Sequence, residues 1–251
     1  MTWTLSHQTA SRIRRLTILS VATIFAALAG CTTIDFDSLE PGTFSGTLIV
    51  MWVGEGSATS GDGKFVFVPD PYSRLTFQRP GGASPPIVPG IMYTDGGSVP
   101  RIVQPFKGFN PWGYAPAYMI HDWIFTAHHC LAEGRTDAAY AAVRDIDFHQ
   151  SAIVLGEAIH TLMTKNLVSE NDVAKRAITA AVNSPIAEKI WDGHPGQCDG
   201  DAVQPADLRE IERFLAGSTA AEAKRRNLNI AKEAKSLARP SRAREVGRIA
   251  F

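Results

Sequence analysis

The stretch PAYMIHDWIFTAHHCL, residues 116–131, marks the point at which the chain changes from a strand-like to a helical pattern. Its apolar residues recur at alternating intervals of three and four, the period of one helix face, at Ala117, Ile120, Ile124, Ala127 and Leu131. Pro116 suits the first turn of a helix. We therefore predict a helix that begins near residue 116 and packs this stripe into the core.

Upstream of this helix the chain has the composition of strands. Four segments are rich in β-branched and aromatic residues, at 44–54, 64–69, 73–78 and 87–93. Glycine- and proline-rich turns separate them. This arrangement predicts a small antiparallel sheet.

Downstream the chain remains helical in pattern. The sequence LAEGR (131–135) ends the first helix, and further apolar-periodic segments follow, one with Gly217 as its expected C-cap. The last segment is basic and also predicted helical. The fold class is therefore α+β, a small antiparallel sheet followed by a mainly helical body.

The N-terminus has the pattern of a secretory signal. Arg12, Arg14 and Arg15 precede an apolar run at 16–29 that is shorter than a membrane span. The run ends in LAGC, which resembles the lipobox of bacterial lipoproteins, so Cys31 is the expected lipidation site. Because threonine rather than aspartate follows Cys31, the resemblance implies the periplasmic face of the outer membrane. The alternatives are a plain secretory signal or an uncleaved anchor.

These features predict four parts of the chain: a signal peptide (1–30), a tether (31–43), an α+β domain (44–217) with its motifs within 93–150, and a basic helical tail (218–251). The tail carries nine lysines and arginines against three glutamates, whereas residues 31–217 have a net charge of −9. The tail is either a ligand for anionic lipid or a solvated helix. The acidic main body and the envelope location exclude nucleic acid as a partner.

Two cysteines remain besides Cys31. In an oxidising compartment Cys130 and Cys198 would form a disulfide, and no other intramolecular pairing is open to them.

A histidine–aspartate pair lies within the first helix. Helical geometry places His121 at the edge of the core face and turns Asp122 toward solvent or a neighbouring loop. If the next helix folds back antiparallel, Asp145 faces His121 and fixes its tautomer. We expect the nearby His128 and His129 to lie at the surface.

Two motifs together resemble a known family. YTDGGSVPR (93–101) and the GYxxAxxxHDW pattern (113–123) are similar in order and spacing to the phage and bacterial family called domain of unknown function 1353, over roughly residues 44–150. The resemblance implies that the following residues meet in space: Asp95, Ser98, Pro100, Arg101, Tyr114, His121 and Asp122. It implies no activity. Phe125 stands where the family usually has tyrosine.

A looser likeness is to secreted phospholipases A2, in which a glycine-rich calcium loop precedes a helix with adjacent histidine and aspartate. By that likeness Asp122, with Asp95 and loop oxygens, would bind a divalent cation, calcium first, while His121 deprotonates water. The cysteine framework of that family is missing here.

The same residues are also consistent with a purely structural role, in which Arg101 pairs with Asp122 or Asp95. The sequence therefore leaves two functions open. One is an envelope hydrolase of lipid or cell-wall substrates, assisted by a metal. The other is a non-catalytic binding or assembly module of phage origin.

Overall fold

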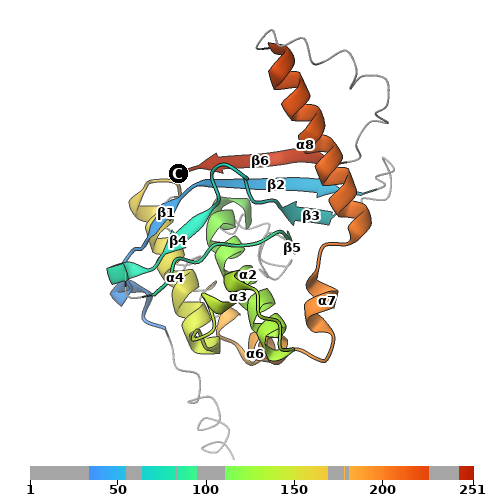
Figure 1. Cartoon of the computed structure of the whole chain (residues 1–251). Coiled ribbons are helices and arrows are strands. Elements are labelled where there is room, and N and C mark those ends of the chain that lie inside the picture. Colours follow the sequence, from blue (N-terminus) through green and yellow to red (C-terminus); the bar gives the residue numbers. More distant parts are fainter. Residues whose placement is uncertain are drawn as a thin grey trace, which may run out of the picture. The chain divides into compact units, whose positions relative to one another are not determined.

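The structure is a computed structural model that describes residues 34–54, 64–82, 84–94, 111–168, 178, 181–225 and 243–251. The signal peptide and Cys31 lie outside the described residues, as do Asp95, Ser98 and Arg101. The predicted α+β class is confirmed by a small antiparallel sheet packed with helices (Figure 1).

Within the described residues, the main sheet has four strands in the order β5-β3-β2-β6, all antiparallel to their neighbours. Their bounds are β2 Thr47–Val53, β3 Lys64–Phe67, β5 Met92–Thr94 and β6 Arg244–Ala250. A second sheet pairs β1 (Thr43–Ser45) with β4 (Thr76–Gln78).

Gly46 divides the predicted 44–54 strand into β1 and β2. Its φ is +86°, and a Cβ there would lie 1.9 Å from the carbonyl oxygen of Arg74. Both the backbone angle and this close approach require glycine.

The central strand β2 is buried on both faces, which explains its continuous apolar run rather than an alternating one. Leu48 and Val50 belong to the cluster that contains the α2 and α4 side chains, whereas Ile49 and Met51 pack in a second cluster with Ile211 of α8. The sheet is therefore sandwiched between helices.

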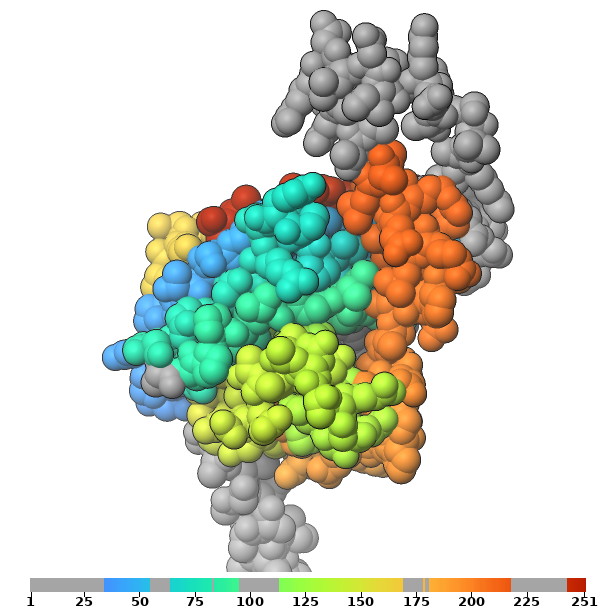
Figure 2. Space-filling model, in the orientation of Figure 1, coloured from blue at the N-terminus to red at the C-terminus, as the bar shows by residue number. Residues whose placement is uncertain are grey.

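The helical body consists of α2 (Ala115–Ala132), α3 (Ala138–Ala141), α4 (Phe148–Thr164), α6 (Pro185–Asp192), α7 (Gln197–Asp201) and α8 (Pro205–Arg225). Short 3-10 turns lie at Phe36–Ser38, Pro80–Gly82 and Pro111–Tyr114. In Figure 2 the α7–α8 segment forms an orange band beside the sheet-forming segments. None of the helices in the described ranges combines the length and apolar composition needed to cross a bilayer.

The predicted helical tail at 218–251 is wrong in two respects. The helix α8 continues through Gly217 to Arg225, and residues 244–250 form a strand. β6 pairs with β2 along its length, and the ring of Phe251 stacks on Phe44 with centroids 4.9 Å apart. The strand is fixed by this distant pairing, and six of its seven residues are exposed, so its local pattern carried no strand signal.

Candidate functional site

The candidate site is centred on His121, in the second turn of α2. The predicted apolar stripe of this helix is buried at Ala117, Ile120, Ile124 and Ala127, with Leu131 half-buried at its end. This packing holds His121 beside the stripe, where the residue is only 7% exposed.

His121 has an incomplete set of hydrogen bonds. Its Nδ1 lies 3.9 Å from Oδ1 of Asp122, beyond hydrogen-bond distance, and its buried Nε2 has no partner among the described residues. The ring packs against Phe125, with centroids 4.8 Å apart. A buried imidazole nitrogen in this condition is rare in folded proteins.

The predicted pairing of His121 with Asp145 is not present. Asp145 is exposed in the turn between α3 and α4, and within the described chain the carboxylate beside His121 is that of Asp122. The prediction assumed that one continuous helix follows α2 and runs back along it. Instead, the short helix α3 and the turns around it lie between α2 and α4, so Asp145 is not placed opposite His121.

The described part of the first motif does meet the second. Thr94, at the end of β5, has its hydroxyl 3.4 Å from Oδ2 of Asp122. Tyr93 lines the same cavity as His121. Tyr114, which the family resemblance places with these residues, is buried in the core at the start of α2.

A cavity of about 560 Å³ opens beside His121, a volume typical of ligand sites. Its lining includes polar residues from β5, α2 and α7: Tyr93, His121, Asp122, His129, Gln197 and Asp201. It also includes apolar residues: Phe125, Ala181, Val182, Ile186, Ala187 and Ile190.

His129 in the same cavity is buried, contrary to the expected surface position, and it was not among the predicted site residues. Its Nδ1 lies 2.9 Å from Oδ2 of Asp201 and its Nε2 lies 2.9 Å from the carbonyl oxygen of Ile190. A carboxylate and a carbonyl only accept, so this arrangement is satisfied at both ring nitrogens by the protonated ring, the imidazolium. Burial lowers the pKa of His129, but the bonds to Asp201 and Ile190 outweigh it, and the pKa is raised.

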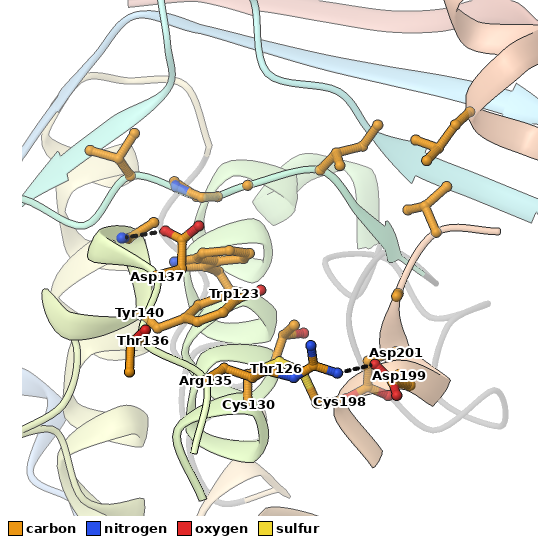
Figure 3. Close-up of a pocket in the computed structure, with 18 of the residues that line it drawn as sticks. Trp123, Thr126, Cys130, Arg135, Thr136, Asp137, Tyr140, Cys198, Asp199 and Asp201 are labelled. Carbon is orange, nitrogen blue, oxygen red and sulfur yellow. Dashed lines mark hydrogen bonds and ion pairs between the residues drawn. A yellow bond between two sulfur atoms is a disulfide. The ribbon is translucent and has the colours of Figure 1, made fainter. Parts of the chain in front are cut away.

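The disulfide between Cys130 and Cys198 explains how this pair is assembled. It joins α2 to α7, next to His129 at one end and three residues before Asp201 at the other. Figure 3 shows the disulfide and Asp201 close together. The cysteine pairing was therefore the one sequence signal that could have located the His129–Asp201 contact.

The predicted cation site is only partly described. Asp122 is half-buried beside the cavity, whereas Asp95 lies outside the described residues. Within the described ranges, no group of three or more histidine, cysteine, aspartate or glutamate side chains is arranged to hold a metal ion.

Comparison with known proteins gave no match: no protein-family model fits this chain, and no curated protein or solved structure is significantly similar to it.

Proposed function

We propose that this chain is a lipid-anchored bacterial envelope hydrolase that cleaves lipid esters, with His121 as general base. The observation that supports the proposal most directly is the Nε2 atom of His121, buried beside a 560 Å³ cavity with no partner among the described residues. A buried, unsatisfied titratable group beside a cavity is a frequent mark of a functional site.

The lining of the cavity favours an amphipathic substrate over a purely polar one. The lining combines polar groups, among them His121 and Asp122, with apolar side chains, three of which come from α6. Two of these, Ile186 and Ile190, lie one helical turn apart and are 76% and 51% exposed. An ester headgroup would contact the polar groups while an acyl chain covers these isoleucines.

The chemistry requires few groups. With its hydrogen on Nδ1, His121 accepts a proton from water at Nε2, and the oxygen of that water attacks the ester carbonyl. The proton then passes to the departing alcohol, so an ester and water give an acid and an alcohol. The Asp122 carboxylate, 3.9 Å from Nδ1, stabilises the imidazolium formed on the way.

The envelope location rests on the LAGC sequence at 28–31 and is supported by the disulfide between Cys130 and Cys198. Disulfides persist in the periplasm and are rare in the cytosol. Lipid chains on Cys31 would hold the domain at a membrane, where its substrate would be found.

The test is an esterase and phospholipase assay on the full chain in detergent, compared with His121→Gln. We expect the variant to lose about 10²- to 10⁴-fold in rate with its folding intact. His194→Gln is the matched control, because His194 is exposed and outside the cavity lining. Equal rates in wild type and His121→Gln would refute the proposal.

The same assay separates the alternatives. Repeating it with calcium, with a chelator and with Asp122→Asn tests the cation expected from the phospholipase likeness. Fatty-acid binding without turnover would instead favour the non-catalytic binding module.

A further inference from the structure

A second cavity, of about 790 Å³, lies on another side of α2. The segment before β5, the α2 and α3 helices and the α7 region surround it (Figure 3). Among the described lining residues, it shares Thr126 and Asp201 with the cavity at His121. Its volume is within the range of sites for small ligands.

Two aromatic side chains form one wall of this second cavity. The rings of Trp123 and Tyr140 lie with centroids 5.4 Å apart, and Figure 3 shows them side by side. Gly90 covers the indole from the other side: a Cβ at Gly90 would lie 2.7 Å from the ring. The glycine therefore lets the segment before β5 rest directly on Trp123.

The indole also offers an unused donor. Trp123 is 4% exposed, and its buried Nε1 has no hydrogen-bond partner among the described residues. Buried tryptophan nitrogens usually find an acceptor, because leaving one unsatisfied costs free energy. An acceptor on a bound ligand would satisfy it.

Asp137 supplies acceptors beside this donor. Figure 3 shows its carboxylate next to the indole of Trp123. One oxygen, Oδ1, accepts from the backbone N–H of Ala139 at 2.8 Å and caps α3. That contact leaves lone pairs on the carboxylate available to ligand hydroxyl groups.

The charges of the lining do not favour an ionic ligand. Arg135 pairs with Asp199, and Asp201 pairs with His129. The remaining charged residues in the described part of the lining are Arg74 and Asp137. The ligand is therefore expected to be neutral and rich in hydroxyl groups.

We infer that this second cavity is a saccharide-binding site. The C–H face of a pyranose ring stacks on the half-buried ring of Tyr140, and its hydroxyl groups accept from the indole N–H of Trp123 and donate to the carboxylate of Asp137. The inference is independent of the proposed hydrolysis at His121, and an inactive protein would still bind the sugar.

The experiment is calorimetric titration of the full chain with a tetramer of N-acetylglucosamine and with maltotetraose, together with tryptophan fluorescence. The detergent has to lack a sugar headgroup, which would compete. We expect saturable binding of at least one oligosaccharide and a fluorescence change. Trp123→Phe, which keeps an aromatic ring but removes the N–H, should weaken binding about tenfold.

Two further variants protect the test against misfolding. Asp137→Asn keeps the helix cap, because asparagine also caps, and should weaken binding severalfold. Trp52→Phe is the control, since Trp52 lies on β2 against Arg244 and outside the cavity lining. The inference is overturned if neither sugar binds to folded wild type, or if binding is unchanged in both Trp123→Phe and Asp137→Asn.

Discussion

His121 and His129 lie eight residues apart on the same helix and are almost equally buried, at 7% and 5% exposure, yet their surroundings differ. His129 has both ring nitrogens bonded, to Asp201 and to the carbonyl of Ile190. The Nε2 of His121 has no partner among the described residues, and its Nδ1 is 3.9 Å from the nearest oxygen of Asp122.

The difference shows that burial alone does not separate a fully bonded histidine from one with an unused ring nitrogen. A doubly bonded imidazolium has no lone pair with which to accept a proton, so His129 holds α2, α6 and α7 together. A neutral buried ring with an unbonded nitrogen keeps a lone pair that can accept a proton. Burying that nitrogen without a hydrogen bond lowers the stability of the fold, and such unsatisfied groups are frequent at functional sites.

The largest expected effect comes from the disulfide that positions Asp201 beside His129. Replacing both Cys130 and Cys198 by alanine should lower the free energy of unfolding by about 2–4 kcal/mol, because the unfolded chain gains entropy. Urea melts of the oxidised wild type and the double variant measure it. The proposed ester hydrolysis at His121 should survive at low temperature, since that ring is held by α2 and Phe125. Lost activity with unchanged stability would contradict this division of roles.

The next effect is that of His129 itself. His129→Leu removes one of the two described donors of Asp201 and one of the two described donors of the Ile190 carbonyl, because Gln197 and the backbone N–H of Gly193 still donate to them. The loss of these two bonds should cost about 2–3 kcal/mol, less than a fully buried pair because the side chain of Asp201 is 26% exposed. Thermal or urea denaturation provides the measurement, with His194→Gln as control. A loss below about 0.5 kcal/mol, the range of ordinary surface changes, would show that the pair is not structural.

A smaller effect concerns pH. The pKa of His129 is raised in the folded state, so its contribution to stability is complete below the ordinary histidine value of about 6.5. It is lost as the pH rises through the higher folded value. We therefore expect wild-type stability to decline above about pH 6.5 relative to His129→Gln.

The neighbouring His128 should act in the opposite sense. Burial first, and then the charge of His129, lowers its pKa, so its contribution falls as the medium becomes acidic. Stability measured against pH for His128→Gln and for His129→Gln distinguishes the contributions of the two histidines. If wild type and His129→Gln show the same stability profile above pH 6.5, the imidazolium assignment is wrong.

The fold class, the start of α2 and most of its buried face could be predicted because they depend on local periodicity. The β6 strand could not, because it depends on β2, far away in the chain. The His129–Asp201 pair depends on a residue 72 positions later, and only the pairing of Cys130 with Cys198 pointed toward it. The Asp145 prediction failed for a related reason. It assumed a plain hairpin, and α3 changes the path between the helices.

The smallest expected effect has the opposite sign and tests the comparison most directly. His121→Leu removes a buried nitrogen that has no partner among the described residues and adds apolar surface next to Phe125. We expect it to raise the free energy of unfolding by about 1 kcal/mol, since no hydrogen bond is lost and a desolvation cost is removed. The variant should at the same time lose the proposed hydrolysis. The measurement is urea denaturation of His121→Leu and His129→Leu side by side. If the two histidines have different roles, the free energy of unfolding rises in the first variant and falls in the second. If His121→Leu destabilises the fold as much as His129→Leu, then His121 also has a structural partner, and its Nε2 is not available to a substrate.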